Sequence, residues 1–378
     1  KIELFQMTDE SFDTFIDLGK TAIRGISFNK ETKKVENHIE LKIQNDLTNN
    51  FFNEEKLIED LIFNLEKKNG KYLNEIFLMV NNSNILSISI TVLKKSDKQI
   101  LDNNFIKYIT DEAKFEINKN YPHYEIVHSI IQNFFVDKKI FSELPNNLKH
   151  KKFAVEFNFI VYPKSFLENL KKVFVRQNVI IKKFIFSSYS KSIFYLNKIF
   201  EKKKIIFVDI GFEKTCAFRF ENKKIKEYKI IPIGGNHITK DISKVLKIEI
   251  SKAEEIKLNF NNIDNDKSLK KDQIELLKKV IFARVEELLE ISTLFFTDNV
   301  GLKNVKLFFF GNGSKILDSK FKSSIIFKYD IDLLDENYID ICLSGLDLIN
   351  NEKEIFVNKL DFKNKKKSFF EKFFNLFG

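Results

Sequence analysis

The hydrophobic pattern of this chain contains the same strand, turn and strand unit twice. Residues 12–28, FDTFIDLGKTAIRGISF, predict two strands joined by a tight turn at Gly19, because apolar β-formers flank a residue that tolerates sharp turns. Residues 205–220, IIFVDIGFEKTCAFRF, predict a second such unit. Each carries Asp-x-Gly at the end of its first strand, and Asp17 and Asp209 lie 192 positions apart (209 minus 17). The repeat predicts two related lobes whose turns face one shared cleft.

Helical and strand patterns alternate elsewhere, as in an α/β protein. In the first lobe these patterns predict a helix at 54–68, a strand at 76–80, a helix at 164–176, a strand at 179–186 and a helix at 190–202. Between the first strand and the second helix they predict an inserted α+β block at 85–163, which contains a strand, a helix at 105–119 and strands at 125–135 and 153–162. In the second lobe they predict a strand ending at Pro232, a helix starting near Thr239, a long helix at 272–296, and a strand at 305–310 that leads into Gly311-Asn312-Gly313-Ser314 and a short helix.

The composition is that of a globular protein, with 43% hydrophobic and 31% charged residues. The two cysteines, Cys216 and Cys342, lie far apart, which excludes a disulfide framework and fits a reducing compartment such as the cytoplasm. No window approaches about 18 uncharged apolar residues, so any membrane contact is expected to be peripheral. The five histidines are dispersed, which predicts neither a metal cluster nor a histidine-based triad; only His237 lies in a motif, where we expect a structural role.

The Asp-x-Gly turns suggest a phosphate site. Glycine lets backbone N–H groups approach phosphate oxygens, and a carboxylate at a strand end can hold Mg²⁺, usually through water. The strand, glycine turn and helix start at 305–314 suggest a further nucleotide-binding arrangement. Two ordinary hairpins and a bare glycine turn are the alternatives.

Five motifs resemble the actin/Hsp70/sugar-kinase superfamily and, within it, FtsA, the actin homologue of bacterial cell division. They are, in order, Asp17-Leu-Gly19, Asp209-Ile-Gly211, PIGGNHITKD at 232–241, AEEIK at 253–257 and FGNGS at 310–314. The resemblance implies an α/β, actin/Hsp70-like two-lobed ATPase fold with an inserted small α+β subdomain and a C-terminal amphipathic helix. It implies a first lobe core (1A) at 12–85 and 164–203, the inserted subdomain (1C) at 86–163, a second lobe core (2A) at 204–240 and 302–350, an outer subdomain (2B) at 241–301, a linker at 351–365 and the terminal helix at 366–378.

The resemblance also implies a site for ATP or ADP with Mg²⁺. The implied nucleotide-binding residues are Asp17, Gly19, Lys20, Thr21, Asp209, Gly211, Thr215, Gly234, Gly235, Glu254, Lys257, Gly311, Gly313 and Ser314, with Asp17 and Asp209 also as metal ligands. Two positions depart from the family's pattern. The second turn reads Phe212-Glu213-Lys214 where the family is rich in glycine and hydroxyls, and Lys20 replaces a hydroxyl residue in the first. Because Phe212 restricts backbone approach and Glu213 repels phosphate, we expect at most weak ATPase activity.

The partner sites are likewise implied by the resemblance. In FtsA the outer subdomain offers Arg and Glu side chains to the C-terminal peptide of FtsZ, here Arg284 and Glu287, with Lys270 and Lys271 adding positive charge. The alternative for Arg284 and Glu287 is a solvated ion pair within one helix. The inserted subdomain would contact other division proteins and neighbouring protomers of a filament.

The implied function is that of an ATP-binding, filament-forming protein that tethers FtsZ to the cytoplasmic face of the inner membrane at the septum and recruits later division proteins. A sugar-kinase-like phosphotransferase and a pilus-assembly actin-like adaptor are the alternatives. The phosphotransferase needs a catalytic carboxylate and a sugar site that the sequence does not reveal, and neither alternative explains the tail.

The last residues, KKKSFFEKFFNLFG, predict an amphipathic membrane-binding helix. At 100° per residue the apolar side chains of this helix fall on one face, and lysines precede it. The chain has a net charge of +10, so an acidic partner is expected. The apolar face and the adjacent lysines favour an anionic membrane surface as that partner, and no nucleic acid. The predicted membrane residues are Phe369, Phe370, Phe373, Phe374, Phe377, Lys365, Lys366 and Lys367. Docking of this helix on the protein's own core is the alternative.

Deleting residues 368–378, or changing Phe370 and Phe373 to Glu, should release the protein from anionic vesicles without unfolding it. Each fully buried Phe contributes about 1.5–3 kcal/mol, so the loss of two is enough to reverse a peripheral attachment. Flotation with liposomes measures the effect, and circular dichroism controls for folding. Unchanged flotation of both variants would contradict the membrane role of the tail.

Overall fold

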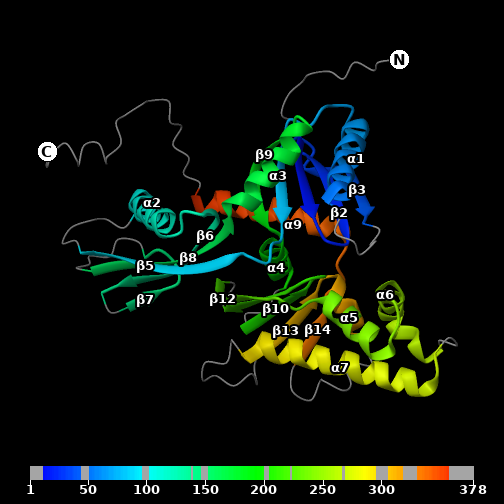
Figure 1. Ribbon diagram of the computed structural model, residues 1–378. Helices are drawn as coiled ribbons and strands as arrows, with labels where there is room; N and C mark the ends of the chain where they lie inside the picture. The colour runs from blue at the N-terminus through cyan, green and yellow to red at the C-terminus, as the bar shows by residue number, and fades with distance from the viewer. Residues whose placement is uncertain are drawn as a thin grey trace.

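The computed structural model describes residues 12–43, 51–95, 102–137, 139–145, 152–199, 204–221, 224–265, 269–294, 305–317 and 330–356, without the side chains of 51–54, 224, 265, 294, 330 and 351–356. Two five-stranded mixed sheets form the two lobes, and a four-stranded sheet projects beside the first (Figure 1). The tail residues 365–378 lie outside the described residues. No helix in the described part of the chain is long and apolar enough to cross a membrane.

The first lobe is a sheet covered by helices on both faces. Its strands run in the order β3-β2-β1-β4-β9, and they are β1 (Phe12–Leu18), β2 (Ala22–Asn29), β3 (Lys34–Lys42), β4 (Glu75–Val80) and β9 (Ile180–Phe186). Gly25 of β2, which pairs with Ile16, faces Leu61 and Leu65 of α1 (Phe51–Asn69). Phe15 points to the opposite face, where α9 (Tyr338–Phe356) packs.

The second lobe repeats this sheet strand for strand. Its order is β12-β11-β10-β13-β14, built from β10 (Lys204–Ile210), β11 (Thr215–Glu221), β12 (Lys224–Ile231), β13 (Val305–Phe310) and β14 (Asp330–Leu333). In both sheets the first strand pairs antiparallel with the second and parallel with the fourth. The helices of this lobe are α5 (Gly235–Leu246), α6 (Ile250–Leu258) and α7 (Lys271–Leu294). The predicted repeat is therefore confirmed as a repeat of topology.

The third sheet lies within residues 86–163 and is antiparallel throughout. Its order is β5-β8-β6-β7, from β5 (Leu86–Lys95), β6 (Tyr124–Val136), β7 (Lys139–Phe141) and β8 (Lys152–Pro163), with α2 (Asn103–Asn120) against it. A core of its own forms around Phe153, Phe157 and Phe159 of β8. At the end of β8, the hydroxyl of Tyr162 donates to the carbonyl of Val80, 2.8 Å away, and ties this unit to the first lobe.

Several boundaries differ from those predicted. β3, β7, β14, α6 and α9 were not foreseen. Helix α9 packs on the first sheet, whereas the sequence placed its residues up to 350 in the second lobe core and 351–356 in a linker. Helix α5 begins at Gly235, not near Thr239, because Gly235 N–H and Asn236 N–H donate to carbonyls of the second turn. Helix α4 (Ser187–Lys198) follows β9 directly and begins three residues before the predicted Ser190. α3 (Lys164–Arg176) has the predicted bounds.

Helix α9 lies closest to the first sheet at Gly345, so a larger side chain at this position tests the packing between them. A Cβ added there would lie 2.8 Å from Met79 Sδ and 3.0 Å from Phe15 Cδ1. We therefore expect Gly345→Val to lower the free energy of unfolding by about 1–3 kcal/mol, the usual cost of overpacking a core. Ala283→Val on the exposed face of α7 is the matched control. Chemical denaturation compares the two, and equal stabilities would contradict the close contact.

Candidate functional site

A cleft of about 260 Å³ lies between the lobes, where the turns after β1 and β10 meet. The residues after β4 and β13, the start of α4 and the residues before α9 also line it. The volume is close to the lower limit of about 300 Å³ for small-molecule pockets. The cleft is therefore narrow in this structure, and a nucleotide would have to widen it.

Each carboxylate oxygen of Asp17, at the first turn, has one protein partner. One carboxylate oxygen accepts a hydrogen bond from Ser187 Oγ at 2.7 Å, and the other pairs with Arg24 Nη1 at 3.1 Å. Arg24 also binds Glu40 at 2.8 Å. Burial acts to lower the pKa of Arg24, but the charges of Asp17 and Glu40 outweigh it and raise the pKa. The guanidinium is therefore a permanent counter-charge to Asp17.

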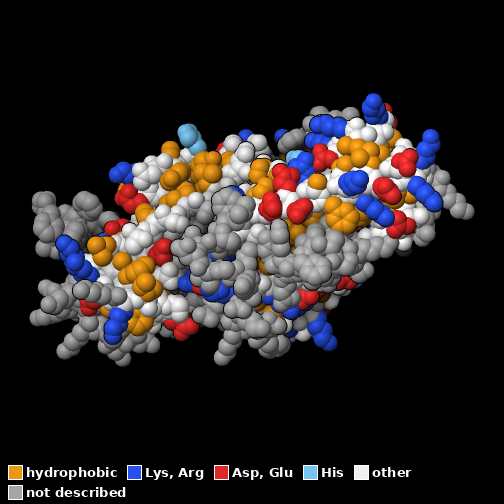
Figure 2. Space-filling view, turned by 90° about the horizontal axis from the view of Figure 1, so that it is seen from below, with side chains coloured by type: hydrophobic (Ala, Val, Ile, Leu, Met, Phe, Trp, Pro, Cys, Tyr) orange, Lys and Arg blue, Asp and Glu red, His pale blue; other side chains and the backbone are white. Residues whose placement is uncertain are grey.

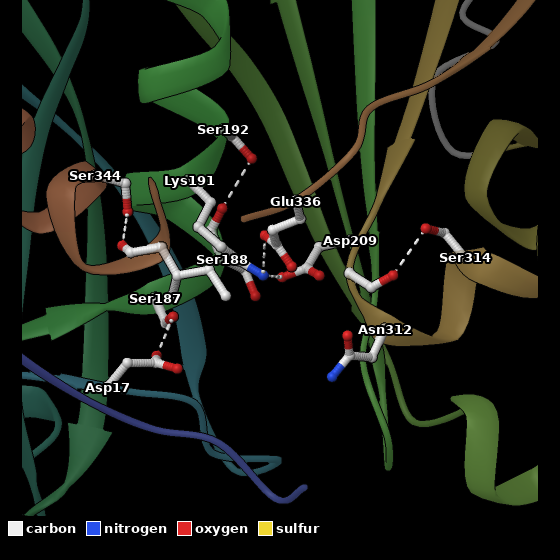
Figure 3. A network of polar contacts seen from close by, with 12 residues as sticks. Asp17, Ser187, Ser188, Lys191, Ser192, Asp209, Asn312, Ser314, Glu336 and Ser344 are labelled. Atoms are coloured by element: carbon white, nitrogen blue, oxygen red, sulfur yellow. Dashed lines mark hydrogen bonds and ion pairs between the residues drawn. The ribbon is translucent and has the colours of Figure 1, made fainter. Parts of the chain in front are cut away.

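The second turn places Asp209 against a lysine that the sequence analysis missed. Lys191 of α4 lies with its Nζ 3.0 Å from Asp209 Oδ2 and 3.0 Å from Glu336 Oε1, and Figure 3 shows it pointing between the two carboxylates. The three side chains are 9%, 4% and 7% exposed. Burial acts to lower the pKa of Lys191, but Asp209, Glu336 and Asp17 raise it well above its usual range. Burial raises the pKa of Glu336, while Lys191 opposes that shift.

The backbone of the second turn is held by α5. Gly235 N–H donates to Gly211 O at 2.9 Å and Asn236 N–H donates to Phe212 O at 2.8 Å. The first N–H groups of α5, which could bind an anion, are thus used within the protein. Lys214 extends from the same turn and donates to the Asn82 carbonyl of the first lobe, and burial lowers its pKa.

The structure separates the predicted nucleotide residues into two groups. The residues that line the cleft are Asp17, Gly19, Lys20, Thr21, Asp209, Gly211 and Gly311. Those that lie outside its lining are Thr215, Gly234, Gly235, Glu254, Lys257, Gly313 and Ser314.

Glu254 and Lys257 bind each other behind the second turn. Their side chains are 2.6 Å apart, and Lys257 also donates to Thr239 Oγ1 at 2.9 Å and to Gly235 O at 3.2 Å. Burial lowers the pKa of Lys257, and the charge of Glu254 opposes this. In this arrangement the pair braces α5 against α6, and ribose or base recognition would require one of these bonds to open.

The two predicted metal ligands do not fit a resident Mg²⁺ as they are arranged. Both oxygens of Asp17 accept from protein donors, and Asp209 Oδ2 binds Lys191. The other oxygen of Asp209 lies against Gly311, whose φ of 88° brings its backbone so close that a Cβ would collide with the carboxylate. Among the described residues, no group of three or more His, Cys, Asp or Glu side chains is placed to hold a metal ion.

The predicted partner residues on α7 do not form one cluster. Arg284 pairs with Asp241 of α5 at 2.6 Å and with Glu287 at 2.5 Å, so the ion pair considered as the alternative is present. Lys270 and Lys271 stand at the start of α7, about 20 Å from Arg284 at 1.5 Å per residue.

Comparisons of the sequence point to one family. A family model described as "Cell division protein FtsA" matches residues 206–316, which contain the second turn, α5 to α7 and β13. FtsA of Helicobacter pylori (strain ATCC 700392 / 26695) is 26% identical over 138 residues, covering 36% of this chain and 28% of that protein. FtsA of Bacillus subtilis (strain 168) is 26% identical over 186 residues, covering 45% and 42%. The matched stretch therefore spans less than half the length of these relatives.

Comparisons of the structure reach across most of the chain. The chain in the structure titled "PilM-PilN type IV pilus biogenesis complex" superposes with a TM-score of 0.58 at 13% identity, covering 85% of this chain and 88% of that one. Ethanolamine utilization protein EutJ from Carboxydothermus hydrogenoformans gives a TM-score of 0.50 at 12% identity, covering 90% and 91%. At these identities the likeness concerns the fold alone. Together the comparisons confirm what the motifs indicated: the chain has an actin/Hsp70-like fold, and its sequence is similar to that of the bacterial cell-division protein FtsA.

Proposed function

We propose that this protein is an FtsA-type division adaptor that binds ATP or ADP in the cleft between its lobes. It associates with copies of itself, attaches through its tail to the cytoplasmic face of the inner membrane at the septum, and links FtsZ and later division proteins to that surface. One observation carries the proposal: two matching sheets direct their Asp-x-Gly turns into a single cleft, and the FtsA match spans one of these turns.

Positive side chains in the cleft support the binding of phosphate groups. Lys20, Lys191 and Lys214 line it. Lys20 is exposed and could approach an anion that enters between the turns, whereas Lys191 and Lys214 are held by bonds within the protein and act from fixed positions. The N–H groups at the start of α5 are already bonded to the second turn, which removes one means of recognising the terminal phosphate. We therefore propose little discrimination between ATP and ADP, and at most weak hydrolysis. We propose that binding does not depend on Mg²⁺, because Asp17 and Asp209 are already paired with Arg24 and Lys191.

Partner contacts by the inserted subdomain are supported by its exposed apolar side chains. Leu93 of β5, Phe115 of α2 and Ile140 of β7 are 56%, 65% and 66% exposed. Figure 2 shows apolar side chains among the charges on the side of the molecule that holds this subdomain. A partner that covered these three side chains would remove their apolar surface from water. We propose division proteins or the next protomer of a filament as that partner.

The adaptor is favoured over the two alternatives. A phosphotransferase needs a carboxylate positioned to act as a base. Of the four acidic residues that line the cleft, Asp17, Asp209 and Glu336 are each paired with a buried cation, and the fourth, Glu213, is exposed to solvent. The likeness to the PilM-PilN chain is one of fold at 13% identity, while the sequence matches are to FtsA.

Isothermal titration calorimetry tests the nucleotide proposal. The wild type should bind ATP and ADP with similar affinity, and Lys20→Glu should weaken both by roughly 10- to 30-fold, because a screened attraction of about 1 kcal/mol becomes a repulsion of similar size. Lys172→Glu, an equal charge change on the exposed face of α3, is the control and should bind as the wild type does. No binding of either nucleotide to the wild type would refute the proposal.

Binding of the acidic FtsZ C-terminal peptide tests the role of Arg284. Because this side chain is held by Asp241 and Glu287, a peptide carboxylate must compete with them. Arg284→Gln should weaken binding about tenfold, the value of a modest charge-assisted contact, whereas Asp241→Asn should strengthen it. Fluorescence anisotropy measures both, with Lys278→Gln on the same helix as the control. Equal affinities of Arg284→Gln and the wild type would leave Arg284 as an internal ion pair only.

A further inference from the structure

The cleft contains a buried cation site that is filled by the protein itself. Asp209 comes from β10, Glu336 precedes α9, and between their carboxylates stands the Nζ atom of Lys191 from α4, 3.0 Å from an oxygen of each (Figure 3). We propose that this ammonium occupies the place of a divalent cation, so that the cleft operates without a bound metal ion.

The charges around Lys191 support this assignment. A divalent ion bound to Asp209 Oδ2 would lie within a few ångströms of the ammonium, and two cations at that distance repel strongly in a buried site. The Nζ atom also lies 5.1 Å from the centre of the Phe310 ring, at the distance of a cation–π contact, which further favours the ammonium in this place.

The same contacts join the two lobes. Lys191 belongs to α4, which follows the first sheet, whereas Asp209 ends the central strand of the second. Two further hydrogen bonds cross the cleft, from Lys214 to Asn82 O and from Asn312 Nδ2 to Thr21 Oγ1 at 3.2 Å. The lobes are therefore held together by side chains of the protein, with no bridging metal ion required.

Manganese(II) alone, added to the nucleotide-free full chain, tests the proposal by electron paramagnetic resonance, in which bound Mn²⁺ loses the six-line signal of the free ion. The wild type should bind no Mn²⁺ in the cleft, so the signal of the free ion should remain. Lys191→Gln should gain one site, at least tenfold tighter than any in the wild type, because Asp209, Glu336 and the new amide oxygen then face one point and oxygen ligands suit Mn²⁺.

Matched variants separate the cleft from the surface. Lys198→Gln removes an exposed lysine of the same helix, paired with Asp340, and should gain no site. Adding Asp209→Asn to Lys191→Gln should abolish the gained site. A folded Lys191→Gln protein that binds no additional Mn²⁺ would overturn the proposal.

The wild type supplies a second, independent readout if Lys191→Gln does not fold. Its melting temperature should be the same in EDTA and in millimolar Mg²⁺. One equivalent of Mn²⁺ bound by the wild type and lost in Asp209→Asn would overturn the proposal outright. Because Mn²⁺ is added without nucleotide, these results do not depend on the proposed nucleotide binding, and either proposal can fail alone.

Discussion

The neutralisation of buried carboxylates between the lobes is the constraint on which the rest of this structure depends. The side chains of Asp17, Asp209 and Glu336 are 6%, 4% and 7% exposed there, and Arg24 and Lys191 supply the counter-charges. Removing one member of a buried pair costs about 3–5 kcal/mol, because the other is left charged in a poorly solvated place. Since the partners come from β1, β2, β10, α4 and the residues before α9, their pairing restricts how these elements can be arranged.

Aromatic packing surrounds these charges and continues the contact between the lobes. The ring centre of Phe186, at the end of the first sheet, lies 5.8 Å from that of Phe218 in the second sheet. The ring centre of Tyr195 in α4 lies 5.1 Å from that of Phe310. Offset and tilted rings at such distances stabilise a buried interface beyond their area alone. Phe310, whose ring centre lies 5.1 Å from Lys191 Nζ, covers one of the ion pairs, and such apolar surroundings strengthen the pair and make the loss of one partner more costly.

The same features bear on how an actin-like fold could serve as an adaptor. The paired turns face one cleft, while the first N–H groups of α5 bind the backbone of the second turn and Lys191 binds the carboxylate of Asp209. Binding and turnover therefore make different demands on this cleft. A protein that responds to a nucleotide by a change of shape needs nucleotide binding but not turnover. The contacts with partners then lie on its outer surfaces.

The local pattern of residues by itself determined the repeated strand, turn and strand units and most of the helices, because alternation and helical spacing depend only on near neighbours. The resemblance to FtsA likewise came from the sequence alone, through five short motifs. It placed Asp17 and Asp209 on one cleft through the repeat alone. It could not assign Lys191, which within SSYSKSIFYL resembles any helix-surface lysine, or Glu336, which lies 145 positions further on (336 minus 191). It also placed the start of α5 too late, since the bonds that begin this helix come from the turn after β10. Tertiary structure decided these features, because burial and charge pairing between distant residues arise only when the two lobes close on each other.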